Sequence, residues 1–209
     1  TRSVAPDVTP SGTRMNDAAC DPHGRLWAGT MADDHHTAGG GLHRLGRDGR
    51  IEQVMDGLTI SNGLGWSPDG ATMFLADSGP RVVRAYDFDG ESGTLARERT
   101  LVTLDQDLGA PDGLTVDQDG DLWVAVYGGG QVRRYSPDGV LRGVVSIPTP
   151  QTTCCAFAGP GMSRLYVTTA TEGWTDERRR TDPSAGVVYC VDTGATGVPA
   201  AQFRPEGSW

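Results

Sequence analysis

The chain has 209 residues, and its 18 basic and 27 acidic side chains give a net charge of −9. This acidic balance argues against nucleic acid or an anionic membrane as the binding partner. No apolar run approaches the roughly 20 residues that a membrane-spanning helix needs. The 30 glycines and 13 prolines are typical of an all-β protein with many tight turns.

One short phrase occurs four times along the chain, at residues 16–24, 62–70, 112–120 and 153–161. In each copy a polar residue stands eight positions before a turn glycine, and an apolar burst follows the glycine. This pattern predicts a strand, a hairpin turn and a second strand in every copy. Third strands are expected at 41–45, 81–86, 131–135 and 186–191, and an outer strand at 140–147. Residues 172–183 read as a charged insertion that forms a solvated loop, and no helix is predicted.

The apolar bursts contain large anchor residues that stand 47, 49 and 43 residues apart: Trp27, Phe74, Trp123 and Tyr166. A period of roughly 40–50 residues with several strands per repeat is the signature of a β-propeller. Three tryptophans on the predicted strands, Trp27, Trp66 and Trp123, are expected to pack between blades. Four blades lie at the low end of the usual range of about four to eight. An unclosed propeller exposes two sheet edges. Because the chain also enters the first repeat abruptly, we expect that about two blades precede it in the natural polypeptide.

The first strand of each propeller blade lines the central channel, so equivalent positions in the repeats face one axis. The fixed offset before the turn glycine therefore places four oxygen-bearing side chains at one end of the channel: Asn16, Asn62, Asp112 and Thr153. Amide and carboxylate oxygens suit a hard divalent cation such as calcium, magnesium or manganese. The alternative is that these side chains only satisfy backbone groups where the strands begin.

The four cysteines lack the paired spacing of a zinc site: Cys20, Cys154, Cys155 and Cys190. We expect reduced thiols that are buried in strands, as in a cytoplasmic protein.

Two histidines, His35 and His36, precede a glycine-rich stretch. A metal site there is one interpretation, but flexible loops hold ligands poorly. We therefore expect a mobile lid over the channel mouth.

Several of these segments resemble the SMP-30/gluconolactonase/regucalcin-like family. The resemblance rests on residues 14–17, 21–31, 60–67, 110–114, 152–155 and 165–169, which occur in the family's order and spacing. It implies an all-β, six-bladed β-propeller, of which about four blades are present in this chain. Residues 1–209 would then form one domain that is incomplete at its N-terminus.

The resemblance also implies a metal-dependent hydrolase that opens small, sugar-derived lactones at the channel mouth. In the family pattern Asn62 and Asp112 are metal ligands, and Asp112 also serves as the catalytic base. The family's substrate-binding positions correspond to Arg14, Asn16 and Asp34, with Asp33 as the alternative for the last. Calcium is the expected ion, while zinc, magnesium, manganese and iron remain open.

The family's third metal ligand is a glutamate in a phrase that this chain lacks. Two protein ligands fall short of the six to eight oxygens that calcium takes, so we expect the chain alone to bind metal weakly. Two other functions remain in competition with the lactonase. One is a related hydrolase of organophosphates or other lactones, and the other is a non-catalytic propeller that binds protein partners.

Overall fold

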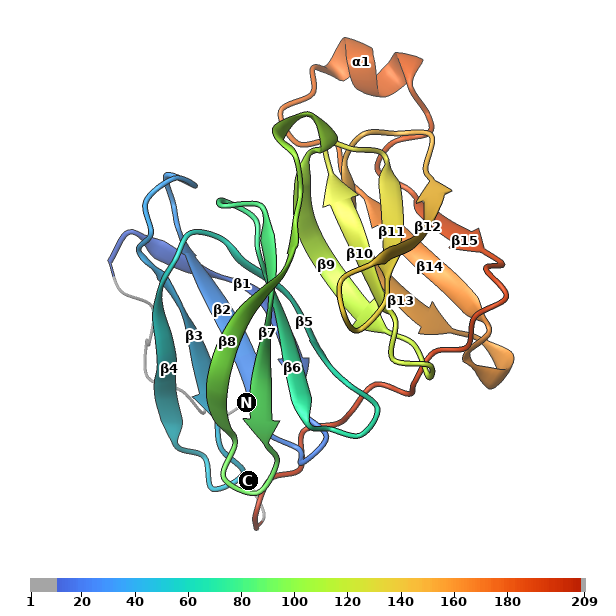
Figure 1. Ribbon diagram of the computed structural model, residues 1–209. Coiled ribbons are helices and arrows are strands. Elements are labelled where there is room, and N and C mark those ends of the chain that lie inside the picture. Colours follow the sequence, from blue (N-terminus) through green and yellow to red (C-terminus); the bar gives the residue numbers. More distant parts are fainter. Residues whose placement is uncertain (1–10, 208–209) are drawn as a thin grey trace.

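Four antiparallel sheets, each built from consecutive strands, form successive blades of a β-propeller in the computed structural model, which describes residues 11–207 (Figure 1). The first blade contains β1 (Thr13–Cys20), β2 (Leu26–Ala32), β3 (Gly40–Leu45) and β4 (Ile51–Leu58). The second contains β5 (Ser61–Trp66), β6 (Thr72–Asp77), β7 (Val82–Asp89) and β8 (Thr94–Thr103). The third contains β9 (Ala110–Val116), β10 (Leu122–Tyr127), β11 (Gln131–Tyr135) and β12 (Leu141–Ser146). The fourth contains β13 (Thr152–Ala158), β14 (Arg164–Thr169) and β15 (Val188–Val191).

The predicted repeat is confirmed, since each copy of the phrase supplies the innermost strand of one blade and the turn after it. Neighbouring innermost strands contact one another in the order β1, β5, β9 and β13. The four strands therefore line one side of a common channel.

A buried aspartate explains why the turn in the repeated phrase forms. The Asp117 carboxylate accepts hydrogen bonds from the backbone N–H of Asp119 and Asp121, at 3.0 and 2.9 Å, and from Trp123 Nε1 at 2.9 Å. Gly120 completes the turn with φ of 86°, a conformation that favours glycine. In the first blade the Asp21 carboxylate likewise accepts hydrogen bonds from the backbone N–H groups of its turn and from the Trp27 indole. The turn, the second strand and the aromatic anchor are thus joined by one carboxylate.

The hydrophobic core lies between blades. One cluster fills the space between the first and second blades and contains Trp27, Leu42, Met73 and Leu75. A second, between the second and third blades, contains Phe74, Val83, Leu122 and Val124. A third, against the fourth blade, contains Trp123, Phe157, Leu165 and Val167. The expectation that three tryptophans pack between blades is confirmed, because Trp27 and Trp123 are buried and Trp66 packs against the first of these clusters.

The predicted loop at residues 172–183 is wrong in one part, because residues Asp176–Thr181 form a short α-helix, α1. The Thr175 side chain caps it by accepting a hydrogen bond from the Arg178 N–H, and the Arg178 guanidinium lies 3.8 Å from the centre of the Trp174 ring. Acidic residues in the first turn and arginines in the last also complement the helix dipole. A helix this short has almost no stability of its own, so its formation depends on these local contacts. Two 3₁₀ turns occupy Gln106–Leu108 and Pro160–Met162.

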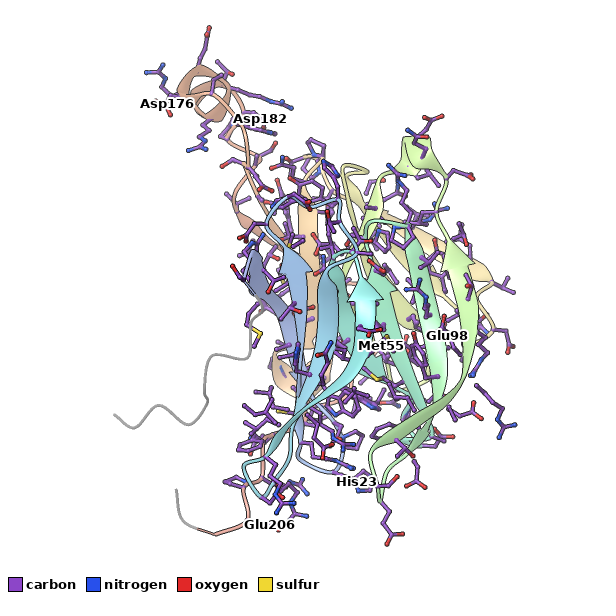
Figure 2. All side chains as sticks on the ribbon, turned by 90° about the vertical axis from the view of Figure 1, so that its left-hand side faces the viewer. His23, Met55, Glu98, Asp176, Asp182 and Glu206 are labelled. Atoms are coloured by element: carbon purple, nitrogen blue, oxygen red, sulfur yellow. The ribbon has the colours of Figure 1, made fainter. Side chains whose placement is uncertain are left out.

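The C-terminal segment crosses the turn end of the blades. It leaves the fourth blade, pairs with the third blade through the Thr196 carbonyl and Gln118 N–H, and reaches the first blade, where Arg204 N–H donates to the Gly24 carbonyl. Figure 2 shows Glu206 at the same end as His23, with α1, between Asp176 and Asp182, at the opposite end. The segment therefore ties three blades together at the end away from the polar positions of the repeat.

All four cysteines are free thiols, as expected, but their burial differs. Cys155 is buried, Cys20 and Cys154 are half-buried, and Cys190 is exposed on β15. The expectation of burial is wrong for Cys190, because its face of the fourth blade is not covered by another blade. In the described part of the chain, no helix has the length and apolar character to span a membrane.

Candidate functional site

Each innermost strand carries a β-bulge, and each bulge contains the repeated polar position. The pairing register shifts between Met15 and Ala18 in β1, between Ser61 and Leu64 in β5, and between Thr152 and Cys154 in β13. In β9 the shift falls opposite Val124 and Val126 of β10, at Asp112 and Gly113. A bulge breaks the strict alternation of side chains and re-aims them. The repeated polar residue of every blade therefore lies at a bulge, and these bulges occupy equivalent positions along the channel.

Asn62 and Asp112 are brought together across the second and third blades. The Asn62 amide donates to Ser78 Oγ at 3.0 Å, and it also hydrogen-bonds the Asp112 carboxylate. Ser78 Oγ in turn donates to the carbonyl of Pro111, the residue before Asp112, at 2.6 Å. The two predicted metal ligands therefore belong to one hydrogen-bonded unit.

Asp112 is the most perturbed carboxylate of this unit. Burial, and secondarily the negative charge of Asp17, raise the pKa of Asp112 to about 7, although hydrogen bonds from Asn62 and the Gly113 backbone oppose the shift. Burial also raises the pKa of Asp17 above its ordinary value. A carboxyl that titrates near neutral pH can exchange protons with water or substrate under ordinary conditions.

Asn16 lies beside this unit, whereas Thr153 is engaged within its own blade. Asn16 Nδ2 donates to the Ser61 carbonyl at 2.9 Å, which fixes its amide against the strand that carries Asn62. The hydroxyls of Thr153 and Thr168 are 2.7 Å apart, so the Thr153 side chain is satisfied by β14. Of the four predicted positions, three therefore meet around the channel.

Among the residues that the structure describes, no hydrogen bond or ion pair joins Arg14 or Asp34 to this unit. Arg14 is exposed on β1, and its guanidinium makes a weak contact with the Met15 carbonyl at 3.4 Å. Asp34 lies in the exposed turn after β2, where hydrogen bonds from Thr37, and then from the His36 backbone, lower the pKa of its carboxyl to about 2. Its carboxylate is occupied by its own turn. A substrate-binding role for these two residues stays a prediction.

Sequence reasoning missed Asp17, Ser78 and the Tyr127–Glu172 pair. Tyr127 OH donates to Glu172 at 3.1 Å. Burial, then this hydrogen bond and the charges of Glu172 and Asp112, raise the pKa of Tyr127 to about 12. This pair lies near the channel mouth, since Glu172 also raises the pKa of Asp112.

A comparison of the repeats one position further on could have found Asp17. The residues there are Asp17, Gly63, Gly113 and Cys154. A Cβ at Gly63 would lie 2.5 Å from the Leu114 backbone nitrogen, and one at Gly113 would lie 2.4 Å from Cys154 Sγ. Close blade contact therefore requires glycine at two of these positions, and the other two supply an acid and a thiol.

Burial, and then the charges of Asp17 and Asp112, raise the pKa of Cys154 to about 11, so its thiol is protonated at neutral pH.

The donor chemistry of the channel fits a hard divalent cation in kind but supplies few ligands. Asn62 and Asp112 offer amide and carboxylate oxygens at adjoining positions in a half-buried, acidic environment. Within residues 11–207, no three Asp, Glu, His or Cys side chains come close enough together to hold a metal ion. The described residues thus present part of a coordination sphere, and weak metal binding by the chain stays a prediction.

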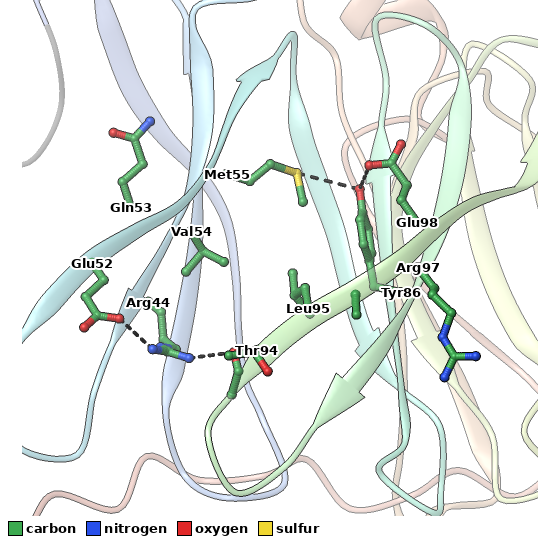
Figure 3. A pocket seen from close by; sticks show the side chains of 12 residues that line it. Arg44, Glu52, Gln53, Val54, Met55, Tyr86, Thr94, Leu95, Arg97 and Glu98 are labelled. Atoms are coloured by element: carbon green, nitrogen blue, oxygen red, sulfur yellow. Dashed lines mark hydrogen bonds and ion pairs between the residues drawn. The ribbon is translucent and has the colours of Figure 1, made fainter.

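A separate hollow of about 520 Å³ lies between the outer strands β4 and β8 (Figure 3). Its central polar groups are paired with one another, since Tyr86 OH contacts Glu98 at 3.1 Å and Met55 Sδ at 3.7 Å. Arg44 pairs with Glu52 at 2.6 Å on its rim. Because these groups are already satisfied, the hollow offers fewer free groups for chemistry than the channel does.

The chain is similar to known proteins over most of its length. Residues 2–171 match the family described as the SMP-30/Gluconolactonase/LRE-like region. The chain is 38% identical over 205 residues to the pentonolactonase XacC of Haloferax volcanii, covering 95% of this chain and 68% of the relative. It is 38% identical over 204 residues to regucalcin of Xenopus laevis, covering 94% and 68%.

Among solved structures, the calcium-binding protein regucalcin from Agrobacterium tumefaciens superposes with a TM-score of 0.86. It is 30% identical to this chain, and the match covers 92% of this chain and 65% of that one. The chain thus spans about two thirds of the length of the relatives that it matches.

Proposed function

The chain belongs to the SMP-30/gluconolactonase/LRE-like family, and on that premise we propose that the protein hydrolyses small, sugar-derived lactones at the mouth of the propeller channel. The observation that carries the proposal is the hydrogen-bonded unit of Asn62 and Asp112, which places an amide and a carboxylate at adjoining positions in the channel. A lactonase needs a base for the attacking water, and in the metal-free protein the pKa of the Asp112 carboxyl is about 7. The lactonase name of XacC supports the substrate class.

Asp112 is the proposed base. Its carboxylate would accept a proton from water that attacks the ring carbonyl, and it would return that proton to the ring oxygen as the ester bond breaks. Burial and the Asp17 charge make the ionised form a better proton acceptor than an ordinary surface aspartate.

One divalent ion, with calcium as the expected metal, would be held by Asn62 Oδ1 and the Asp112 carboxylate. When bound, such an ion supplies Lewis-acid polarisation of the lactone carbonyl. The calcium-binding description of the Agrobacterium tumefaciens relative supports this part of the proposal. The nearby Asp17 carboxylate adds negative charge that favours a cation in the channel.

The substrate hydroxyls would meet Arg14 and Asn16 on β1. The Asn16 amide nitrogen is committed to the Ser61 carbonyl, which leaves Oδ1 as an acceptor for a hydroxyl. The Arg14 guanidinium is exposed and makes only its weak contact with Met15, so it is accessible to a polar substrate.

Acid release from a panel of five- and six-membered sugar lactones, with and without calcium, tests the proposal. Asp112→Asn should abolish turnover, whereas Asp119→Asn should retain it, because Asp119 is exposed on the turn at the opposite end of the same strand. Circular dichroism checks that both variants fold. A folded Asp112→Asn variant with full turnover would exclude the proposed base, and a wild-type protein that is inert on the whole panel would exclude the function.

A further inference from the structure

The hydroxyl of Ser78 lies between the two strands that carry Asn62 and Asp112. Ser78 follows β6 directly, and its Oγ is 3.0 Å from Asn62 Nδ2 and 2.6 Å from the Pro111 carbonyl oxygen. Because Pro111 immediately precedes Asp112, one hydroxyl joins the second blade to the third at the candidate site.

The chemistry of these three groups determines which way the Asn62 amide faces. A serine hydroxyl has one proton to donate, and the Pro111 carbonyl can only accept. The proton of Ser78 is therefore committed to Pro111, and its oxygen can only accept from Asn62. The amide must present its NH₂ end to Ser78, since an oxygen in that place would set two acceptors against each other.

The orientation of the amide decides what the channel can bind. An asparagine side chain has nearly the same shape in its two flipped orientations, but only one of them turns Oδ1 away from Ser78. Ser78 makes the two orientations unequal by one hydrogen bond, in addition to the hydrogen bond that the same amide makes to the Asp112 carboxylate. Only the oxygen end of an amide is a ligand for a cation, so the flip separates a competent site from an incompetent one.

Ser78 is itself held firmly in place. Its backbone N–H donates to the Ile60 carbonyl at 3.1 Å. The preceding residue, Asp77, is buried, accepts from the Ile60 N–H at 3.0 Å and pairs with Arg84 at 3.3 Å. The group that orients Asn62 is thus anchored to the start of the strand on which Asn62 lies.

We propose that Ser78 is a positioning residue, which sets the orientation of the Asn62 amide and fixes it relative to the strand that carries Asp112. The consequence for metal binding and turnover rests on the proposed function. The orientation of the amide does not, and it can be measured separately.

Three variants test the proposal. Ser78→Ala removes the hydroxyl, and Ser78→Thr retains it. Ser67→Ala is the matched control, because Ser67 is also a half-buried serine of the second blade with a hydrogen-bonded hydroxyl, but it lies on the turn at the other end of β5.

The first measurement is ¹⁵N NMR of the Asn62 side-chain amide. In the wild type, Ser78→Thr and Ser67→Ala, we expect an ordered NH₂ group with two well-separated proton signals. In Ser78→Ala the two signals should move toward the positions of a free amide, with slower transverse relaxation. An Asn62 amide that is equally ordered in Ser78→Ala overturns the proposal, whatever the activity of the protein.

The second measurement is the calcium affinity of the same samples by NMR titration, with lactone turnover beside it. Loss of a residue that orients a metal ligand typically costs 10- to 100-fold in metal affinity, and we expect that loss in Ser78→Ala, with recovery in Ser78→Thr. When the wild type binds calcium, unchanged affinity and turnover in Ser78→Ala would contradict the proposal. A disordered Asn62 amide in Ser78→Ala, together with a wild type that neither binds calcium nor turns over lactones, would confirm the positioning role and refute the proposed function.

Discussion

The Asp112→Asn substitution is expected to stabilise the metal-free protein at alkaline pH and to leave its stability nearly unchanged in acid. Burial, and secondarily the Asp17 charge, raise the pKa of Asp112 from 3.8 to about 7, so the native state favours the protonated carboxyl. The resulting penalty is absent below the unfolded pKa, grows as the pH rises between the two values and is complete above the folded pKa. Asparagine cannot ionise and therefore does not meet this penalty.

The size of the effect follows from the shift. A difference of about 3 pKa units corresponds to at most about 4 kcal/mol. Because Asp112 is half-buried, water screens part of the charge, and we expect a gain of about 2 kcal/mol at about pH 8. The gain should be larger at about pH 8 than at about pH 5. Urea unfolding of both proteins in a chelating buffer at these two pH values measures it.

Two comparisons make the result interpretable. Asp119→Asn removes a charge from the same blade at an exposed position, and it should show no such dependence on pH. Saturating calcium should reverse the order of stability, because it stabilises the protein that keeps its carboxylate ligand. If Asp112→Asn changes the free energy of unfolding equally at acid and alkaline pH, the half-buried Asp112 carboxyl does not have a raised pKa, which refutes the prediction.

Three further substitutions or reagents probe the scaffold around the site. Asp117→Ala removes a fully buried carboxylate that accepts three hydrogen bonds and pairs with an arginine, and it should cost about 3–5 kcal/mol in urea unfolding. A cost below about 1 kcal/mol would contradict the structural role of the turn. Gly113→Ala places a Cβ 2.4 Å from Cys154 Sγ and should lower the free energy of unfolding by about 1–3 kcal/mol, whereas wild-type stability would show that the blades are further apart. A thiol reagent followed by mass spectrometry should label exposed Cys190 first, Cys154 slowly because its pKa is about 11, and buried Cys155 last; equal rates would contradict this burial order.

Much of the fold could be predicted because its signals are local. The turn glycine and the apolar burst after it mark a hairpin wherever they occur, and four copies at a nearly constant period predict blades. The residues of β11, Gln131–Tyr135, agree with the predicted third strand. The helix α1 was missed because six residues have no detectable helical periodicity, and it depends on the cap at Thr175 and the stacking on Trp174.

By itself, the sequence determined that four polar residues occupy one equivalent position in four repeats, since offset and period are properties of the chain alone. Only the tertiary structure decided which of them meet. A bulge in each innermost strand re-aims the side chain, and Ser78, from a different strand, joins Asn62 to the strand of Asp112. The pKa of Asp112 likewise depends on burial between blades and on the charge of Asp17, which is 95 positions away in the chain. Burial and through-space charge depend on how strands from different blades pack, and no single segment of the sequence determines that packing.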